Sequence, residues 1–188
     1  MLEEISMKSS AKFIGLLRGI NVGGRNKIPM TDLCKLCAEI GCGDIQSYIQ
    51  SGNLVFSTLA KPAVVEIELE RAIERRFQLY IPVIVRAAAD WPDYVKGNPF
   101  SEASSAEPNL VMLALAKTNP KPEAASELCG RCTGGERIIQ VGNALWIHFA
   151  GGVARSKISP ALLDRLVGSK VTMRNWRTVL KLGEMVIS

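Results

Sequence analysis

Two halves of this 188-residue chain show nearly the same order of predicted strands and helices. In the first half, the hydrophobic periodicity predicts strands at residues 12–18, 45–50, 54–57 and 81–86, and helices at 31–40 and 63–77. The resulting order, β-α-β-β-α-β, is that of the ferredoxin-like motif. No other feature of the sequence limits the fold as strongly, because this order predicts an α+β class.

The second half follows this order closely but not completely. Strands are predicted at 110–116, 138–141 and 145–149, and helices at 122–129, 160–167 and 175–185, with a loop across 98–108. Ser159 followed by Pro160 is typical of an N-cap and the first helical position. We expect two tandem ferredoxin-like halves packed into one compact unit. The expected divisions are a flexible extension at 1–11, a first half at 12–96 and a second half at 97–188 that ends in a basic helix.

Local patterns refine the two helices of the first half. Thr31 carries a side chain typical of an N-cap, so we expect it to begin the helix at 31–40. In the helix at 63–77, an apolar stripe at helical spacing is expected to face the core, and it consists of Val64, Ile67, Ala72 and Ile73.

The composition is that of a globular protein, with 47% apolar and 22% charged residues. Glu3 and Glu4 stand where a signal peptide would be basic, and no apolar stretch approaches the roughly 20 residues that span a bilayer. We therefore expect a cytoplasmic protein without a membrane partner. Residues 155–188 hold seven cations against two carboxylates and so account for the net charge of +5. Such a cluster attracts phosphates or acidic partners, although it is also typical of a solvated helix surface.

A glycine-rich loop follows the first predicted strand. It reads Arg18-Gly19-Ile20-Asn21-Val22-Gly23-Gly24 and continues through Arg25 and Lys27 into a helix. Glycines let a backbone approach a ligand closely, and a helix N-terminus offers unpaired N–H groups to an anion. The spacing matches neither a P-loop nor a dinucleotide-binding fingerprint. The loop fits either a backbone nest for a phosphate or carboxylate, or a tight structural connection.

A second polar motif, Gln50-Ser51-Gly52-Asn53, joins the two short strands of the first half. Its composition is typical of a hairpin turn. We expect this turn at the opposite end of the sheet from the glycine-rich loop, so that the two motifs would meet only through the second half.

Near the C-terminus, Arg174-Asn175-Trp176-Arg177 places an aromatic residue between cations. Binding of single-stranded nucleic acid combines stacking and phosphate-pairing groups of this kind. However, Trp176 and Val179 lie at helical spacing, which favours a core position for the tryptophan. Arg177 and Lys181 then share a neighbouring helix face that suits a phosphate.

The five cysteines include two C-x-x-C pairs, Cys34/Cys37 and Cys129/Cys132. Structural zinc sites usually keep such pairs about 15 to 20 residues apart, whereas these two are widely separated. Cysteines within an apolar helix pattern behave as small buried hydrophobes. His148 is the only histidine, and the sequence shows no catalytic partner for it. We expect no metal and no cofactor, and the sequence identifies no catalytic residue.

Several motifs together resemble the bacterial domain of unknown function 1697 family. They are the glycine-rich loop with the helix opening Ile28-Pro29-Met30-Thr31-Asp32-Leu33, the segment 48–53, the triplet Arg155-Ser156-Lys157 and the segment 174–181. The resemblance covers residues 12–185. It implies a cytoplasmic α+β protein with related halves, and it implies no activity, substrate or cofactor.

From these observations we interpret the chain as a binding module for a phosphorylated small molecule or another anionic ligand, including nucleic acid. The expected ligand-binding residues are Arg18, Gly19, Asn21, Gly23, Gly24, Arg25, Lys27, Gln50, Ser51, Asn53, Arg155, Lys157, Arg174, Asn175, Arg177 and Lys181. Two alternatives stay open: an enzyme acting on a small phosphorylated or carboxylated substrate, and a homodimerising structural protein without catalysis. The oligomeric state stays open as well.

Overall fold

The computed structural model describes residues 10–187, so the expected extension at 1–11 lies almost entirely outside the described residues. Two four-stranded antiparallel sheets form the framework. The first contains β1 (Ala11–Leu17), β2 (Gly43–Tyr48), β3 (Asn53–Thr58) and β4 (Val83–Ala87), in the order β2-β3-β1-β4. The second contains β5 (Val111–Ala116), β6 (Arg137–Val141), β7 (Ala144–His148) and β8 (Val171–Asn175), in the order β6-β7-β5-β8.

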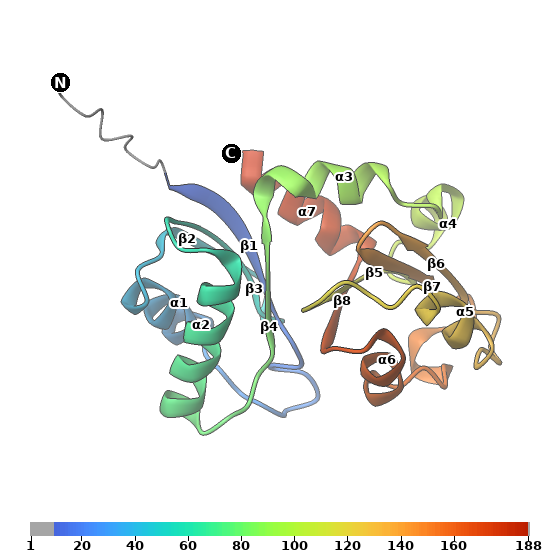
Figure 1. The fold of residues 1–188 in the computed structure, drawn as a ribbon, viewed down its shortest axis with the longest axis horizontal. Helices are drawn as coiled ribbons and strands as arrows, with labels where there is room; N and C mark the ends of the chain where they lie inside the picture. Colours follow the sequence, from blue (N-terminus) through green and yellow to red (C-terminus); the bar gives the residue numbers. More distant parts are fainter. Residues whose placement is uncertain (1–9, 188) are drawn as a thin grey trace.

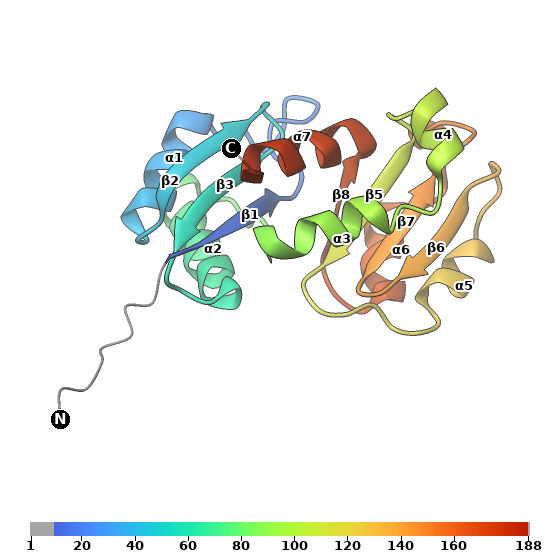
Figure 2. The same cartoon turned by 90° about the horizontal axis from the view of Figure 1, so that it is seen from above.

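Seven α-helices lie within the described residues and cover these sheets. They are α1 (Met30–Glu39), α2 (Pro62–Phe77), α3 (Trp91–Lys96), α4 (Ser101–Ala106), α5 (Ala124–Cys129), α6 (Pro160–Val167) and α7 (Trp176–Ile187), with short 3-10 turns at Ala88–Asp90 and Val153–Arg155. Helices α1 and α2 cover the outer face of the first sheet, and α5 and α6 cover that of the second (Figure 1). Helices α3 and α7 pack against each other over the junction of the halves (Figure 2).

The strands β1 and β5 are apolar along most of their length because both of their faces are covered. In β1, Phe13 and Leu17 face α1 and α2, whereas Ile14 and Leu16 face a core shared by the two halves. Alternation along a strand sends neighbouring side chains to opposite faces, so one apolar run supplies two cores.

The shared core is built around two tryptophans and α7. Trp91 and Trp146 are fully buried in it, together with Val179 and Leu182 of α7. The indole Nε1 of Trp91 donates a hydrogen bond to the Val179 carbonyl at 2.9 Å, which ties α3 to α7. Helix α7 contacts β1 and β3 of the first sheet as well as β5 and β8 of the second, so it holds the two sheets together.

Charged groups join the halves along the edge strand β4. The Nζ of Lys117 lies 2.6 Å from Oε1 of Glu70 on α2, and Arg86 of β4 donates to the Ala116 carbonyl. The buried carboxyl of Glu66 lies beside them. Its burial raises the pKa of Glu66, against the opposing effect of a backbone hydrogen bond and of Lys117 and Arg86.

The predicted elements are confirmed to within about two residues, but several details are wrong. Helix α1 begins at Met30 with Pro29 at its N-cap, so Thr31 is not the cap. Pro29 has the extended ψ of 131° that precedes a helix, which moves the boundary by one residue. In α2, Val64 and Ile67 are 49% and 45% exposed, because the helix turns Val65, Glu66 and Leu69 inwards instead.

Other elements were absent from the sequence-based prediction. Residues 98–108, expected as a loop, contain α4, and α3 precedes them. Strand β8 lies between α6 and α7, where only helices were expected, and Asn175 ends this strand rather than starting α7. Thr172 and Arg174 of β8 are buried, so the strand lacks the apolar alternation by which strands are recognised. None of the helices in residues 10–187 has the length and apolarity to cross a membrane.

Candidate ligand-binding cleft

The glycine-rich loop and the β2–β3 turn lie side by side at one edge of the first sheet. The Leu17 N–H donates to the Gly52 carbonyl at 2.8 Å, and the Asn21 side-chain amide donates to the Gln50 carbonyl at 2.8 Å. The expectation that the two motifs lie at opposite ends is therefore wrong. Strands β1 and β2 both run antiparallel to β3, so they point the same way and their C-terminal ends share an edge.

The glycines of the loop serve a tight turn. Gly23 and Gly24 have φ of +58° and +75°, and the Arg25 N–H donates to the Val22 carbonyl at 3.1 Å. Two successive positive φ values are those of a type I′ turn, which glycine adopts without steric cost. The Asn21 side chain closes the base of the loop by accepting from the Ile28 N–H at 2.9 Å.

The tip of the loop is exposed to solvent. Arg25, Asn26 and Lys27 are all exposed, and a Cβ added at Gly23 or Gly24 would meet no atom within 4 Å. Arg25 and Lys27 do not line the cleft described below. The loop lines that cleft with residues of its first part, Arg18, Gly19 and Val22.

Arg174 of β8 reaches from the second half into this edge of the first half. Its Nη2 donates to the carbonyls of Leu17, Ser51 and Gly52 at 2.7, 3.2 and 3.1 Å, and its Nε donates to Oδ1 of Asn53. Its Nη1 donates to Oγ1 of Thr172 at 2.8 Å and to the Met173 carbonyl at 2.9 Å. Five donor directions of a guanidinium thus meet acceptors from both halves.

All of these acceptors are uncharged. Among residues 10–187, no carboxylate lies within ion-pair distance of Arg174, although the side chain is only 8% exposed. Burial lowers the pKa of Arg174 to about 10, so the group keeps its charge at neutral pH. A buried charge is normally paired with an opposite one. The positive charge of Arg174 is therefore left without a carboxylate counter-charge among residues 10–187.

A cleft of about 390 Å³, which Arg174 helps to line, opens between the two halves. Its apolar lining comes from both halves and consists of Val22, Ile49, Met112, Pro160, Leu163, Val171 and Met173. Its polar lining consists of Ser51, Thr172, Asn175 and Thr178, and its charged residues are Arg18 and Arg174. The two charged groups have the same sign, so the walls favour a negatively charged occupant.

Arg18 stands at the end of β1 and pairs across the cleft with α6. Its Nη1 lies 2.5 Å from Oδ1 of Asp164, and the two side chains are 21% and 15% exposed. Asp164 also accepts from Nζ of Lys170 at 3.1 Å and from the Val171 N–H at 3.0 Å. Burial opposes ionisation of Asp164, but the hydrogen bonds from Arg18, Lys170 and Val171 together lower its pKa.

Other expected site residues have structural contacts near the cleft. Asn53 is fully buried, and its amide donates to the Tyr48 carbonyl at 3.0 Å and to Oγ of Ser51 at 3.1 Å. Asn53 therefore stabilises the β2–β3 turn whose carbonyls accept from Arg174. Asn175 accepts from the Thr178 N–H at 3.0 Å and caps α7. Arg177 and Lys181 are exposed on α7, and Lys181 pairs with Glu184 at 3.0 Å.

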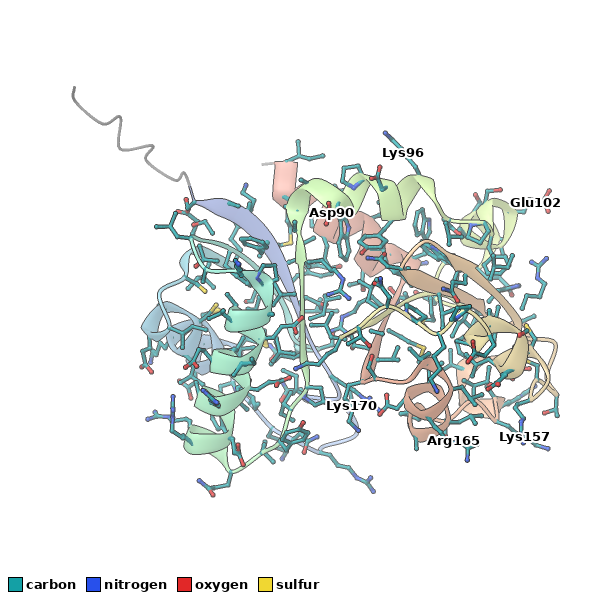
Figure 3. The ribbon with its side chains drawn as sticks, in the orientation of Figure 1. Asp90, Lys96, Glu102, Lys157, Arg165 and Lys170 are labelled. Carbon is teal, nitrogen blue, oxygen red and sulfur yellow. The ribbon has the colours of Figure 1, made fainter. Side chains whose placement is uncertain are left out.

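Arg155 and Lys157 lie outside the cleft. Both are exposed in the segment that leads to α6, and Figure 3 places Lys157 at the far end of the second half, away from Lys170 at the junction. Ser156 between them donates to Oε1 of Glu136 at 2.5 Å and accepts from the Ile158 N–H at 3.1 Å. The expected basic residues therefore lie in four places: the cleft, the tip of the glycine-rich loop, the exposed face of α7 and the segment before α6.

The cysteines and the histidine are also apart from the cleft. Cys34, Cys37 and Cys42 lie in or beside α1, whereas Cys129 and Cys132 lie at the end of α5 in the other half. The two C-x-x-C pairs therefore do not meet. Residues 10–187 contain no group of three or more metal-ligating side chains with suitable placement. His148 is buried, with its Nδ1 3.3 Å from Nη2 of Arg137.

A second hollow, of about 470 Å³, lies between α3 and α7. Its lining is apolar apart from Lys96 and Glu184 at the rim, so few polar groups converge on it. Binding sites for small molecules combine an apolar lining with a few convergent polar groups. The cleft beside Arg174 meets that description, and the hollow between α3 and α7 does not.

Residues 11–146 match the family described as "Protein of unknown function (DUF1697)". The chain belongs to this family. Its structure is similar to that of a conserved bacterial protein, SP0830, from Streptococcus pneumoniae, with a TM-score of 0.71 and 21% sequence identity. The similarity covers 95% of this chain and 99% of that one, and at this identity it concerns the fold alone. No curated protein matches the sequence.

Nine of the fourteen residues that line the cleft of this DUF1697 protein were not among the expected site residues. Met112, Leu163, Thr172, Met173 and Thr178 come from β5, α6, β8 and α7 and form no motif. Asp164 could not be predicted from the sequence either, because its partner Arg18 is 146 residues away in the chain. The sequence offers one signal for these residues. Thr172 and Arg174 alternate with Val171 and Met173, and in a strand this spacing places both polar side chains on the same face.

Proposed function

We propose that this DUF1697 protein binds a small anionic ligand in the cleft between its two halves. The observation that carries the proposal is the buried guanidinium of Arg174, a residue that lines the cleft and has no carboxylate partner in the part of the chain that the structure describes. An anion in the cleft would supply the missing counter-charge. In a partly buried setting this attraction is stronger than at an exposed surface, because water screens it less.

The lining also indicates what else the ligand carries. Thioether and aliphatic side chains, including Met112, Leu163 and Met173, surround the charged wall. Met side chains adapt to irregular apolar shapes. The ligand that suits this cleft is therefore a phosphate or carboxylate attached to an apolar or aromatic group, and a volume of about 390 Å³ suits a small metabolite.

A small molecule fits these observations better than nucleic acid. Single-stranded nucleic acids need a continuous basic groove with exposed aromatic rings. Here Trp176 packs edge-on against Trp146, with 5.7 Å between ring centroids, and neither Arg155 nor Lys157 lines the cleft. The exposed cations on α7 and in the glycine-rich loop are therefore proposed as solvated surface residues.

Calorimetric titration with phenyl phosphate, benzoate and inorganic phosphate tests the proposal. We expect saturable binding of phenyl phosphate and benzoate that weakens at least tenfold in Arg18→Ala, because a hydrogen bond to a charged group contributes about 1.5–3 kcal/mol. Arg25→Ala is the matched control, since Arg25 lies on the same loop outside the cleft. Equal binding by both variants, or no binding by the unaltered protein, would contradict the proposal. Turnover of a phosphorylated probe would favour the alternative of an enzyme.

We also infer that the two halves are ferredoxin-like units related by duplication. The equivalent strand orders β2-β3-β1-β4 and β6-β7-β5-β8 support this inference, as does the antiparallel pairing within each sheet. Duplication places the cleft between equivalent units, which is a common position for a ligand site. A cytoplasmic location remains part of this proposal, and fractionation of cells expressing the tagged chain tests it.

A further inference from the structure

One of the two charged residues of the cleft, Arg18, is already paired with a carboxylate of the protein, Asp164, which does not itself line the cleft. Arg18 lines the cleft, and its Nη1 lies 2.5 Å from Oδ1 of Asp164 on the neighbouring α6. Within the part of the chain that the structure describes, the Arg18 guanidinium makes no other hydrogen bond. Asp164 is therefore the one carboxylate that Arg18 pairs with among the described residues, and the contact uses Nη1 of the guanidinium.

Asp164 does not depend on Arg18 in return. Its Oδ2 accepts from Nζ of Lys170 at 3.1 Å, and its Oδ1 also accepts from the Val171 N–H at 3.0 Å. If Arg18 turned away, the carboxylate would keep one charged partner and one backbone partner. Breaking a buried ion pair is costly when it leaves one charge buried and unpaired. Release of Arg18 does not do so, because Asp164 keeps its other two partners.

The second guanidinium of the cleft behaves differently. Arg174 is held by acceptors on both of its terminal nitrogens and on Nε, so it has no freedom to change partners. Arg18 is 21% exposed and has a single partner. Of the two, only Arg18 is placed to exchange one anion for another.

We propose that Asp164 competes with an anionic ligand for the guanidinium of Arg18. This inference rests on the proposed function of the cleft. Competition by a carboxylate also selects among ligands. A carboxylate ligand only replaces an equivalent group on Arg18, whereas a phosphate monoester brings additional charge and more acceptor oxygens. The cleft therefore favours phosphate monoesters over carboxylates.

The test compares Asp164→Asn with the unaltered protein and with Asp93→Asn, an exposed acid on α3 outside the cleft. Asparagine keeps an oxygen that accepts from the Val171 N–H, but it loses the charge that holds Arg18. We expect Asp164→Asn to bind phenyl phosphate about fivefold to tenfold more tightly, which corresponds to roughly 1–1.4 kcal/mol. Asp93→Asn should bind like the unaltered protein.

Benzoate provides the second measurement. The preference for phenyl phosphate over benzoate should be smaller in Asp164→Asn than in the unaltered protein, because the competing carboxylate has been removed. Asp164→Ser, whose hydroxyl also accepts from the Val171 N–H, gives the same comparison if the asparagine variant does not fold. Unchanged or weaker phenyl phosphate binding by a folded variant would overturn the inference while leaving the cleft as a binding site. Absence of binding in every form would instead overturn the proposed function.

Discussion

Arg174 donates a hydrogen bond from its Nη2 to the carbonyl of Leu17 at 2.7 Å, across 157 positions of sequence. This contact joins the last strand of the second sheet to the end of the first strand of the first sheet. The same guanidinium also holds the β2–β3 turn through Ser51 and Gly52. Arg174 thus holds together segments that border the cleft and is one of the two positively charged residues of its lining. The same side chain therefore matters both for the stability of the fold and for the proposed function.

Replacement of Arg174 should strongly destabilise the protein. Arg174→Ala would leave several buried carbonyls and Asn53 without a donor, and we expect the free energy of unfolding to fall by about 3 kcal/mol or more. Arg174→Lys should also be destabilised, because an ammonium cannot reproduce the planar fork. Urea denaturation measures both. Exposed Arg177→Ala, three residues away, should change stability by less than about 0.5 kcal/mol. A loss of similar size in Arg174→Ala and Arg177→Ala would refute this role.

Two glycines with similar backbone conformations should respond differently to alanine. Gly52 and Gly24 have φ of +78° and +75°, so alanine at either position carries a left-handed penalty of about 1–2 kcal/mol. At Gly52 the added Cβ would also lie 2.7 Å from Cβ of Leu17 and 3.0 Å from Cδ1 of Ile20. At Gly24 the space is open. Denaturation should show a clearly larger loss in Gly52→Ala, and equal losses would argue against tight packing of the turn.

The ion pair of Asp164 predicts a particular dependence of stability on pH. The folded protein lowers the pKa of this carboxyl, so the ionised form stabilises the fold above the unfolded pKa of about 3.9. This contribution is lost as the pH falls through the folded pKa. The stability difference between the unaltered protein and Asp164→Asn should therefore be constant near neutral pH and shrink below about pH 4. A difference that does not change between pH 2 and pH 6 would show that the carboxyl titrates normally.

The cysteines should react at very different rates with an aromatic disulfide reagent. Cys129 is exposed at the end of α5, whereas Cys37 is buried in the core of the first half. The hydrogen bond with Cys42 and burial raise the pKa of Cys37, so its reactive thiolate is scarce. We expect Cys129→Ser to remove the fastest phase of the reaction and Cys37 to react only on unfolding. Persistence of that phase in Cys129→Ser would assign it to another thiol.

Sequence reasoning recovered the elements whose side chains obey simple periodicity. The strand β1 and the helix α6, with Ser159 at its N-cap and Pro160 at its first position, lie at or next to their predicted bounds. The position of each of these two elements is determined by residues close together in the sequence. The apolar stripe of α2 was right for Ala72 and Ile73 but wrong for Val64 and Ile67, because Val64 and Val65 are equally apolar and only the packing against the sheet decides which of the two faces inwards.

The cleft needed information that a single sequence does not carry. Arg18, Ser51 and Arg174 were expected site residues, and the structure brings all three to the cleft. Strand β8 was missed because Thr172 and Arg174 are buried, and the acceptors of the Arg174 side chain in the first half lie more than 120 residues away in the chain. Thr172 and Met173 were therefore not expected as site residues, and Asp164 was not expected because its partner Arg18 is equally distant in sequence. The pairing of distant segments, rather than any local pattern, creates this part of the molecule.

The most direct measurement follows backbone amide resonances of isotope-labelled protein during a titration with phenyl phosphate. Binding in the cleft should produce saturable shifts at Gly19, Ser51, Thr172 and Thr178, which line it in both halves. The amide resonances of Arg155 and Lys157 should not shift, because these residues lie outside the cleft. Saturable shifts confined to Arg155, Lys157 or the exposed face of α7, or no saturable shift at all, would contradict the proposed site.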